Sequence, residues 1–98
     1  MKLKKENLCY HISSNNVWIE DISAFWKMRN EEEVDKTRVV VFPSHIDRQP
    51  VTCIIAAFYR SWWGALKKIM LPKSAINDSH VYIHDYPEGC EPQIEYYD

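Results

Sequence analysis

The segment Pro50-Val-Thr-Cys-Ile-Ile-Ala-Ala-Phe-Tyr-Arg-Ser-Trp-Trp-Gly-Ala-Leu-Lys-Lys-Ile-Met-Leu71 decides the fold, because it is the longest periodic stretch of the chain. Its apolar residues recur at spacings of three and four, which predicts an amphipathic helix over residues 50–71. Pro50 suits the first helical turn, and Pro72 ends the helix. The alternative is a buried strand over Val51–Tyr59 that pairs with residues 38–42 as a hairpin and precedes a short helix over Ser61–Met70.

Two strands and a helix are predicted before this segment. Apolar residues alternate in Leu8-Cys-Tyr-His-Ile12, which is typical of a strand, and the polar residues 13–16 form a turn after it. A helix capped by Asp21 or Ser23 is expected to run to about Lys36. The β-branched run over residues 38–42 ends at Pro43 and predicts a strand that is buried on both faces.

A further strand is predicted after the segment, over His80–Tyr86. Val81 and Ile83 face one side of it, and the other side carries His80, Tyr82, His84 and Tyr86. Residues 87–98 form an acidic loop and a terminal segment that either adds an edge strand near residues 94–97 or frays. We therefore expect one α+β domain over residues 1–98, a small sandwich of order β-α-β-α-β(β).

Charge is distributed unevenly along the chain. Residues 78–98 contain six carboxylates, four of the six tyrosines and no Lys or Arg, so all 12 basic residues precede them. Clustered carboxylates attract basic partners, and exposed tyrosines are frequent anchors at protein interfaces. The end of the chain is therefore the first candidate for a binding surface.

Several kinds of site are disfavoured. The two glycines, Gly64 and Gly89, lie far apart, which excludes a glycine-rich phosphate loop. In a strand, His80 and His84 would lie roughly 13 Å apart, too far to share a metal ion, so no metal and no cofactor are expected. The run Ser44-His-Ile-Asp47 has the residue types of a hydrolase triad, but real triads are assembled from distant segments.

Localisation is predicted from cysteines and hydropathy. Three widely spaced cysteines do not form a secreted disulfide framework and fit a reducing cytoplasm. No apolar stretch reaches the roughly 18 residues that a membrane-spanning helix needs.

These observations favour a non-catalytic cytoplasmic protein of inhibitor, immunity or antitoxin type. It would occlude a basic partner, such as a nucleic-acid-processing enzyme, with an acidic and aromatic surface. The residues assigned to this surface are Tyr82, His84, Asp85, Tyr86, Glu88, Glu91, Glu95, Tyr96 and Tyr97.

Two other functions stay open. A nucleic-acid-binding accessory protein would use the basic and aromatic residues Arg60, Trp63, Lys67 and Lys68, with Trp63 exposed and Trp62 buried in the apolar stripe. A small thiol or metal enzyme would use some of the three cysteines and four histidines.

Overall fold

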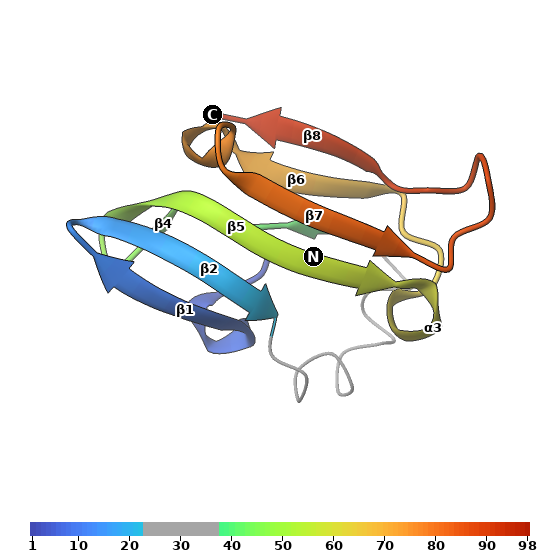
Figure 1. Ribbon diagram of the computed structural model, residues 1–98, viewed down its shortest axis with the longest axis horizontal. Coiled ribbons are helices and arrows are strands. Elements are labelled where there is room, and N and C mark those ends of the chain that lie inside the picture. Colours follow the sequence, from blue (N-terminus) through green and yellow to red (C-terminus); the bar gives the residue numbers. More distant parts are fainter. Residues whose placement is uncertain (23–37) are drawn as a thin grey trace.

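A computed structural model describes residues 1–22 and 38–98, and these residues form a mostly β fold (Figure 1). Two 3-10 turns, η1 (Lys5–Asn7) and η2 (Lys73–Ala75), and one short helix, α3 (Arg60–Trp63), accompany the strands. The strands are β1 (Leu8–Ser13), β2 (Asn16–Ile22), β3 (Val39–Val41), β4 (His45–Ile46), β5 (Gln49–Tyr59), β6 (Lys68–Pro72), β7 (Ser79–His84) and β8 (Gln93–Tyr97). No helix of the described residues reaches seven residues, and none is long and apolar enough to cross a membrane.

The strands form two sheets. One has the order β1-β2-β5-β4, and β7 also pairs with β5; the other has the order β3-β6-β8. Strands β2, β5 and β7 run parallel to one another, as do β3, β6 and β8. Residues from both sheets share one hydrophobic core, so the described part of the chain is a β-sandwich.

Two hairpins begin the five-stranded sheet, and both turns need a left-handed backbone. Ser14 and Asn15 connect β1 to β2 with φ of 51° and 65°. Asp47 and Arg48 connect β4 to β5 with φ of 50° and 69°. Two consecutive residues of positive φ make a type I′ turn, whose twist matches that of the strands it joins. The predicted turn after β1 is therefore present, and Asp47 lies in a hairpin turn.

The predicted helix over residues 50–71 is wrong, because the first half of this segment is the central strand β5. Its helix-like spacing has a physical cause. Val51, Ile54 and Phe58 are all fully buried, and the pairing of β2 with β5 skips Thr52. This β-bulge shifts the alternation by one residue, so an inward set that starts at Val51 continues at Ile54.

The predicted α+β class and the predicted order β-α-β-α-β(β) are therefore also wrong, because no long helix separates β5 from β6. The alternative strand over Val51–Tyr59 coincides with most of β5, but its predicted neighbours do not hold. The helix expected over Ser61–Met70 is only α3, and β6 begins at Lys68. The hairpin with residues 38–42 is absent, because β3 pairs with β6. The helix expected between Asp21 and Lys36 lies largely outside the described residues, and Asp21 itself belongs to β2.

Aromatic side chains fill one end of the core. The Phe58 ring lies 6.3 Å from that of Phe42 and 5.0 Å from that of Trp63. Gly64 follows α3 with φ of 71°, a conformation that favours glycine, and its N–H closes the helix on the Arg60 carbonyl at 2.8 Å. The chain can thus turn from β5 into β6 within a few residues.

Candidate functional site

The acidic end of the chain is partly neutralised by the basic body. Strand β8 lies beside β6, and this places the Glu95 carboxylate 3.1 Å from the Lys68 ammonium. The Asp98 carboxylate lies 3.2 Å from the Lys73 ammonium. Both pairs are exposed, so each stabilises the fold only slightly, but each removes a negative charge from the proposed surface. The charge segregation of the sequence is therefore weaker in three dimensions.

Three of the four tyrosines assigned to the acidic surface face the protein itself. The Tyr86 hydroxyl donates a hydrogen bond to the Gly64 carbonyl at 2.7 Å, and the Tyr97 hydroxyl donates to the Phe42 carbonyl. Burial raises the pKa of both Tyr86 and Tyr97. Tyr96 packs against the core. These side chains support the fold, which leaves Tyr82 as the exposed member of the set.

The loop after β7 carries the remaining predicted acidic residues. Asp85 has φ of 65°, which ends the alternation of β7 and turns Tyr86 away from the face that His84 occupies. Glu88 and Glu91 are exposed, and the Glu91 carboxylate accepts the Gly89 N–H at 3.0 Å. Glu88 and Glu91 therefore lie on a loop that leaves the sheet, and they are separate from Tyr82 and His84 on β7.

The basic segment is not an exposed stacking surface. Trp63 is 2% exposed and lies in the core, whereas Trp62 is 41% exposed, the reverse of the expectation. The long helix that was expected would have turned Trp62 inward, whereas the four-residue helix α3 turns Trp63 inward. Lys67 and Lys68 line a small open cavity of about 280 Å³ together with Glu91. The Lys68 ammonium also contacts the Glu95 carboxylate at 3.1 Å, so part of this positive charge is paired within the chain.

The main exposed surface of aromatic side chains lies on the outer face of the five-stranded sheet. Val17 and Ile19 of β2 are fully buried, so Trp18 between them points outward and is 45% exposed. On β5, Ile55 and Tyr59 point outward in the same way. We define the aromatic face by Trp18, Ile55, Tyr59, Tyr82, His11, His80 and His84.

Strand register brings these residues together. His11 lies opposite Trp18, and their rings are 5.4 Å apart. Tyr59 lies opposite His84, and these rings stack at 4.5 Å with an angle of 12°. Residues opposite each other in a ladder share one face of the sheet, so four strands contribute to a single surface.

The electrostatics of the aromatic face are acidic. None of the strands β1, β2, β5 and β7 contains Lys or Arg. The Glu20 carboxylate contacts His11 at 2.7 Å, and the Asp78 carboxylate contacts His80 at 3.2 Å. Each such pair carries a negative charge when its histidine is neutral. A surface that binds phosphates needs cations, so this face does not suit a nucleic-acid backbone.

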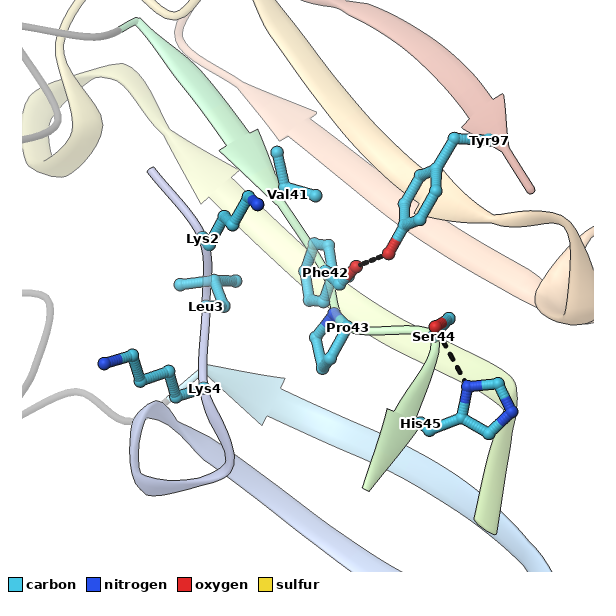
Figure 2. Close-up of a pocket in the computed structure, with 9 residues that line it drawn as sticks. All are labelled: Lys2, Leu3, Lys4, Val41, Phe42, Pro43, Ser44, His45 and Tyr97. Atoms are coloured by element: carbon cyan, nitrogen blue, oxygen red, sulfur yellow. Dashed lines mark hydrogen bonds between the residues drawn. The ribbon is translucent and has the colours of Figure 1, made fainter. Parts of the chain in front are cut away.

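A second depression lies between the N-terminal residues Lys2–Lys4, the segment Val41–His45 and Tyr97 (Figure 2). Its volume is about 420 Å³, which is sufficient for a small ligand. Two hydrogen bonds join polar groups of its lining: Ser44 Oγ lies 3.0 Å from His45 Nδ1, and the Tyr97 hydroxyl donates to the Phe42 carbonyl. Asp47 contacts Lys5 at 3.0 Å, so it does not orient His45. No triad is assembled here.

Thiol and metal chemistry find little support in the described residues. All three cysteines are free, and only Cys53 is buried. Burial raises the pKa of the Cys53 thiol, and the negative charge of Asp78 raises it further, which disfavours a nucleophilic thiolate. Within residues 1–22 and 38–98, no three His, Cys, Asp or Glu side chains gather in a way that could hold a metal ion.

Tyr82 and His84 were expected at a binding surface from the sequence, whereas Trp18, Ile55 and Tyr59 were not. The alternation of Val17-Trp-Ile-Glu20 was a usable signal for Trp18, because a strand with buried Val17 and Ile19 exposes the residue between them. Comparison with protein-family models, curated proteins and solved structures gives no match.

Proposed function

We propose that this chain is a non-catalytic protein-binding factor and that the aromatic face is its contact surface. One observation carries the proposal: Trp18, Ile55, Tyr59 and Tyr82 are each at least 40% exposed and share one face of the five-stranded sheet. Exposed apolar patches of this kind mark interaction sites, and Trp and Tyr contribute most of the binding energy at protein interfaces.

The proposed partner has a basic surface. The aromatic face contains no Lys or Arg, and Glu20 and Asp78 lie on its histidines. Complementary charge accelerates association and excludes partners of the same sign. An inhibitor, immunity or antitoxin role in the cytoplasm, in which the chain occludes a basic nucleic-acid-processing enzyme, is consistent with this surface and with three free thiols.

The proposal relocates the binding surface within the molecule. Tyr82 and His84 belong to both the surface expected from the sequence and the aromatic face. Glu95 is paired with Lys68, and Tyr86, Tyr96 and Tyr97 face the protein. The contacts of these four residues within the chain stabilise the fold, and we assign binding through the aromatic face to Trp18, Ile55, Tyr59 and Tyr82.

The test is affinity capture from the native host with matched variants. Trp18→Ala and Tyr82→Ala remove two anchors, and Trp62→Ala removes a tryptophan of similar exposure from α3. The captured protein is then titrated against each variant at low and high salt. We expect Trp18→Ala and Tyr82→Ala each to weaken binding by about tenfold or more, and Trp62→Ala to leave it unchanged.

Salt dependence and nucleic-acid binding distinguish the proposed function from its alternative. The association rate should fall as salt rises, because charge complementarity acts mainly on encounter. An equal loss of partner affinity in all three variants would overturn the proposal. Salt-sensitive binding of single-stranded RNA or DNA would favour the nucleic-acid alternative if changing Lys67 and Lys68 to Ala abolishes it.

A further inference from the structure

Within residues 1–22 and 38–98, one edge of β7 is paired with no other strand. Among the described strands, β7 pairs only with β5, so the N–H and C=O groups on its other side have no partner strand there. Natural edges are blunted by lysine, proline, a bulge or very short length. The six residues Ser79–His84 have none of these, whereas the opposite edge strand β1 carries a bulge at Cys9 and Tyr10.

The direction of the backbone groups follows from one hydrogen bond. The Asp78 carbonyl accepts the Ile54 N–H of β5 at 3.1 Å. Successive residues of a strand direct their N–H and C=O groups to opposite sides, so His80 and Tyr82 also bond toward β5. Val81 and Ile83 therefore direct their N–H and C=O groups away from β5, into the open edge.

A second, independent observation comes from the three-stranded sheet. Ile94 of β8 pairs with Ile69 of β6 and lies on the same face of the sheet, yet Ile69 is fully buried and Ile94 is 41% exposed. Tyr96 shares this inward face with buried Leu71 and is half-buried. In Figure 1, β8 lies at the border of the molecule, further out than β7, and no strand lies in front of it. The five-stranded sheet is thus one strand too narrow to cover β8.

We infer that an extended segment of a partner protein adds to β7 as a further strand and covers Ile94 and Tyr96. The segment would carry apolar side chains at alternate positions, facing inward beside Val81 and Ile83. Its other side would extend the aromatic face next to His80, Tyr82 and His84. This inference rests on the proposed function, since the segment belongs to the same partner. Backbone hydrogen bonds supply affinity in such strand addition, and alternate side chains supply specificity.

A second copy of the chain is a less suitable occupant. The run His80-Val-Tyr-Ile-His84 is nearly symmetric about Tyr82, with Val and Ile as the exchanged pair. Antiparallel pairing centred on Tyr82 therefore places Val81 opposite Ile83 and His80 opposite His84. A free peptide with the β7 sequence can pair with β7 in this register. Two-fold pairing of whole chains through β7 must also accommodate both copies of β8, which lies further out than β7 in the view of Figure 1.

The test uses a synthetic peptide, acetyl-Ser-His-Val-Tyr-Ile-His-amide, with the sequence of β7. In the register centred on Tyr82, the Val and Ile N–H groups of the peptide face the protein. Methylation of these two nitrogens should abolish binding, and methylation of the Tyr and second His nitrogens should be tolerated. By NMR, bound peptide should slow amide exchange at Val81 and Ile83 of the protein, with little change at His80 and Tyr82.

Protein variants add a control for each part of the site. Val81→Pro removes an N–H that faces the open edge and leaves the β5 ladder intact, as proline on an edge strand does. Ile94→Gln changes the uncovered layer, and Ile12→Gln changes an isoleucine of similar exposure on β1. We expect the first two to weaken peptide and partner binding severalfold to about tenfold, and Ile12→Gln to have no effect.

The outcomes separate this inference from the proposed function. Partner binding that requires Trp18 but tolerates Val81→Pro and Ile94→Gln would overturn strand addition alone. A dimer of the intact chain that Val81→Pro dissociates would assign the edge to a second copy and overturn the inference. Equal binding of both methylated peptides would also overturn it.

Discussion

Replacement of Tyr86 by Phe tests whether this side chain supports the fold or anchors a partner. The change removes only the hydroxyl, which donates to the Gly64 carbonyl at 2.7 Å in a half-buried position. One such hydrogen bond contributes about 0.5–1.5 kcal/mol net. We therefore expect the free energy of unfolding to fall by about 1 kcal/mol, which corresponds to a Tm decrease of about 4–8 °C for a domain of this size.

The matched control is Tyr82→Phe. The Tyr82 side chain is 53% exposed on the aromatic face, so loss of its hydroxyl should change the free energy of unfolding by less than about 0.5 kcal/mol. Urea titration followed by tryptophan fluorescence measures both variants at constant m-value. If Tyr86→Phe is as stable as the unmodified chain, or if Tyr82→Phe is destabilised as much, the assignment of Tyr86 to the fold is refuted.

Three further results are expected. Burial raises the pKa of Tyr86 and Tyr97 above the ordinary 10.0, so the folded state holds these protons more tightly than the unfolded state. The free energy of unfolding should therefore decline as pH rises above 10.0, and urea titrations should show a weaker decline when both residues are Phe. The Cys53 thiol is buried and its pKa is raised, so Ellman's reagent should modify exposed Cys90 rapidly and Cys53 only on unfolding, and equal rates would contradict this. Phe58→Ala should cost about 3–5 kcal/mol by urea denaturation, and a cost below about 1 kcal/mol would show that Phe58 is not central to the core.

Local alternation was readable from the sequence where a strand has one buried and one exposed face. In β7, Val81 and Ile83 are half-buried and face one side, and the alternating residues His80, Tyr82 and His84 are exposed on the other, as predicted. The turn at Ser14 and Asn15 was readable for a similar reason, because it depends only on adjacent residues. Such features need no knowledge of distant partners.

Features that depend on distant pairing were not readable. The bulge at Thr52 exists because β2 pairs with β5, and it gave a strand the spacing of a helix. The contact of Lys68 with Glu95 depends on parallel pairing of β6 with β8, so the sequence showed segregated charge where the structure has an ion pair. The aromatic face depends on two such pairings, of β2 with β5 and of β5 with β7, and only its β7 part was recognised.

The alternation of the chain between two sheets has a consequence for folding. From β5 onward, each successive strand joins the other sheet, so β6 cannot be completed before β8 arrives and β5 remains half-paired until β7 arrives. Among the described strands, the two hairpins alone form from neighbouring residues, and each parallel pairing must first close a long loop. We expect refolding in milliseconds to seconds rather than microseconds, and a fragment that ends before β7 should not hold either sheet together.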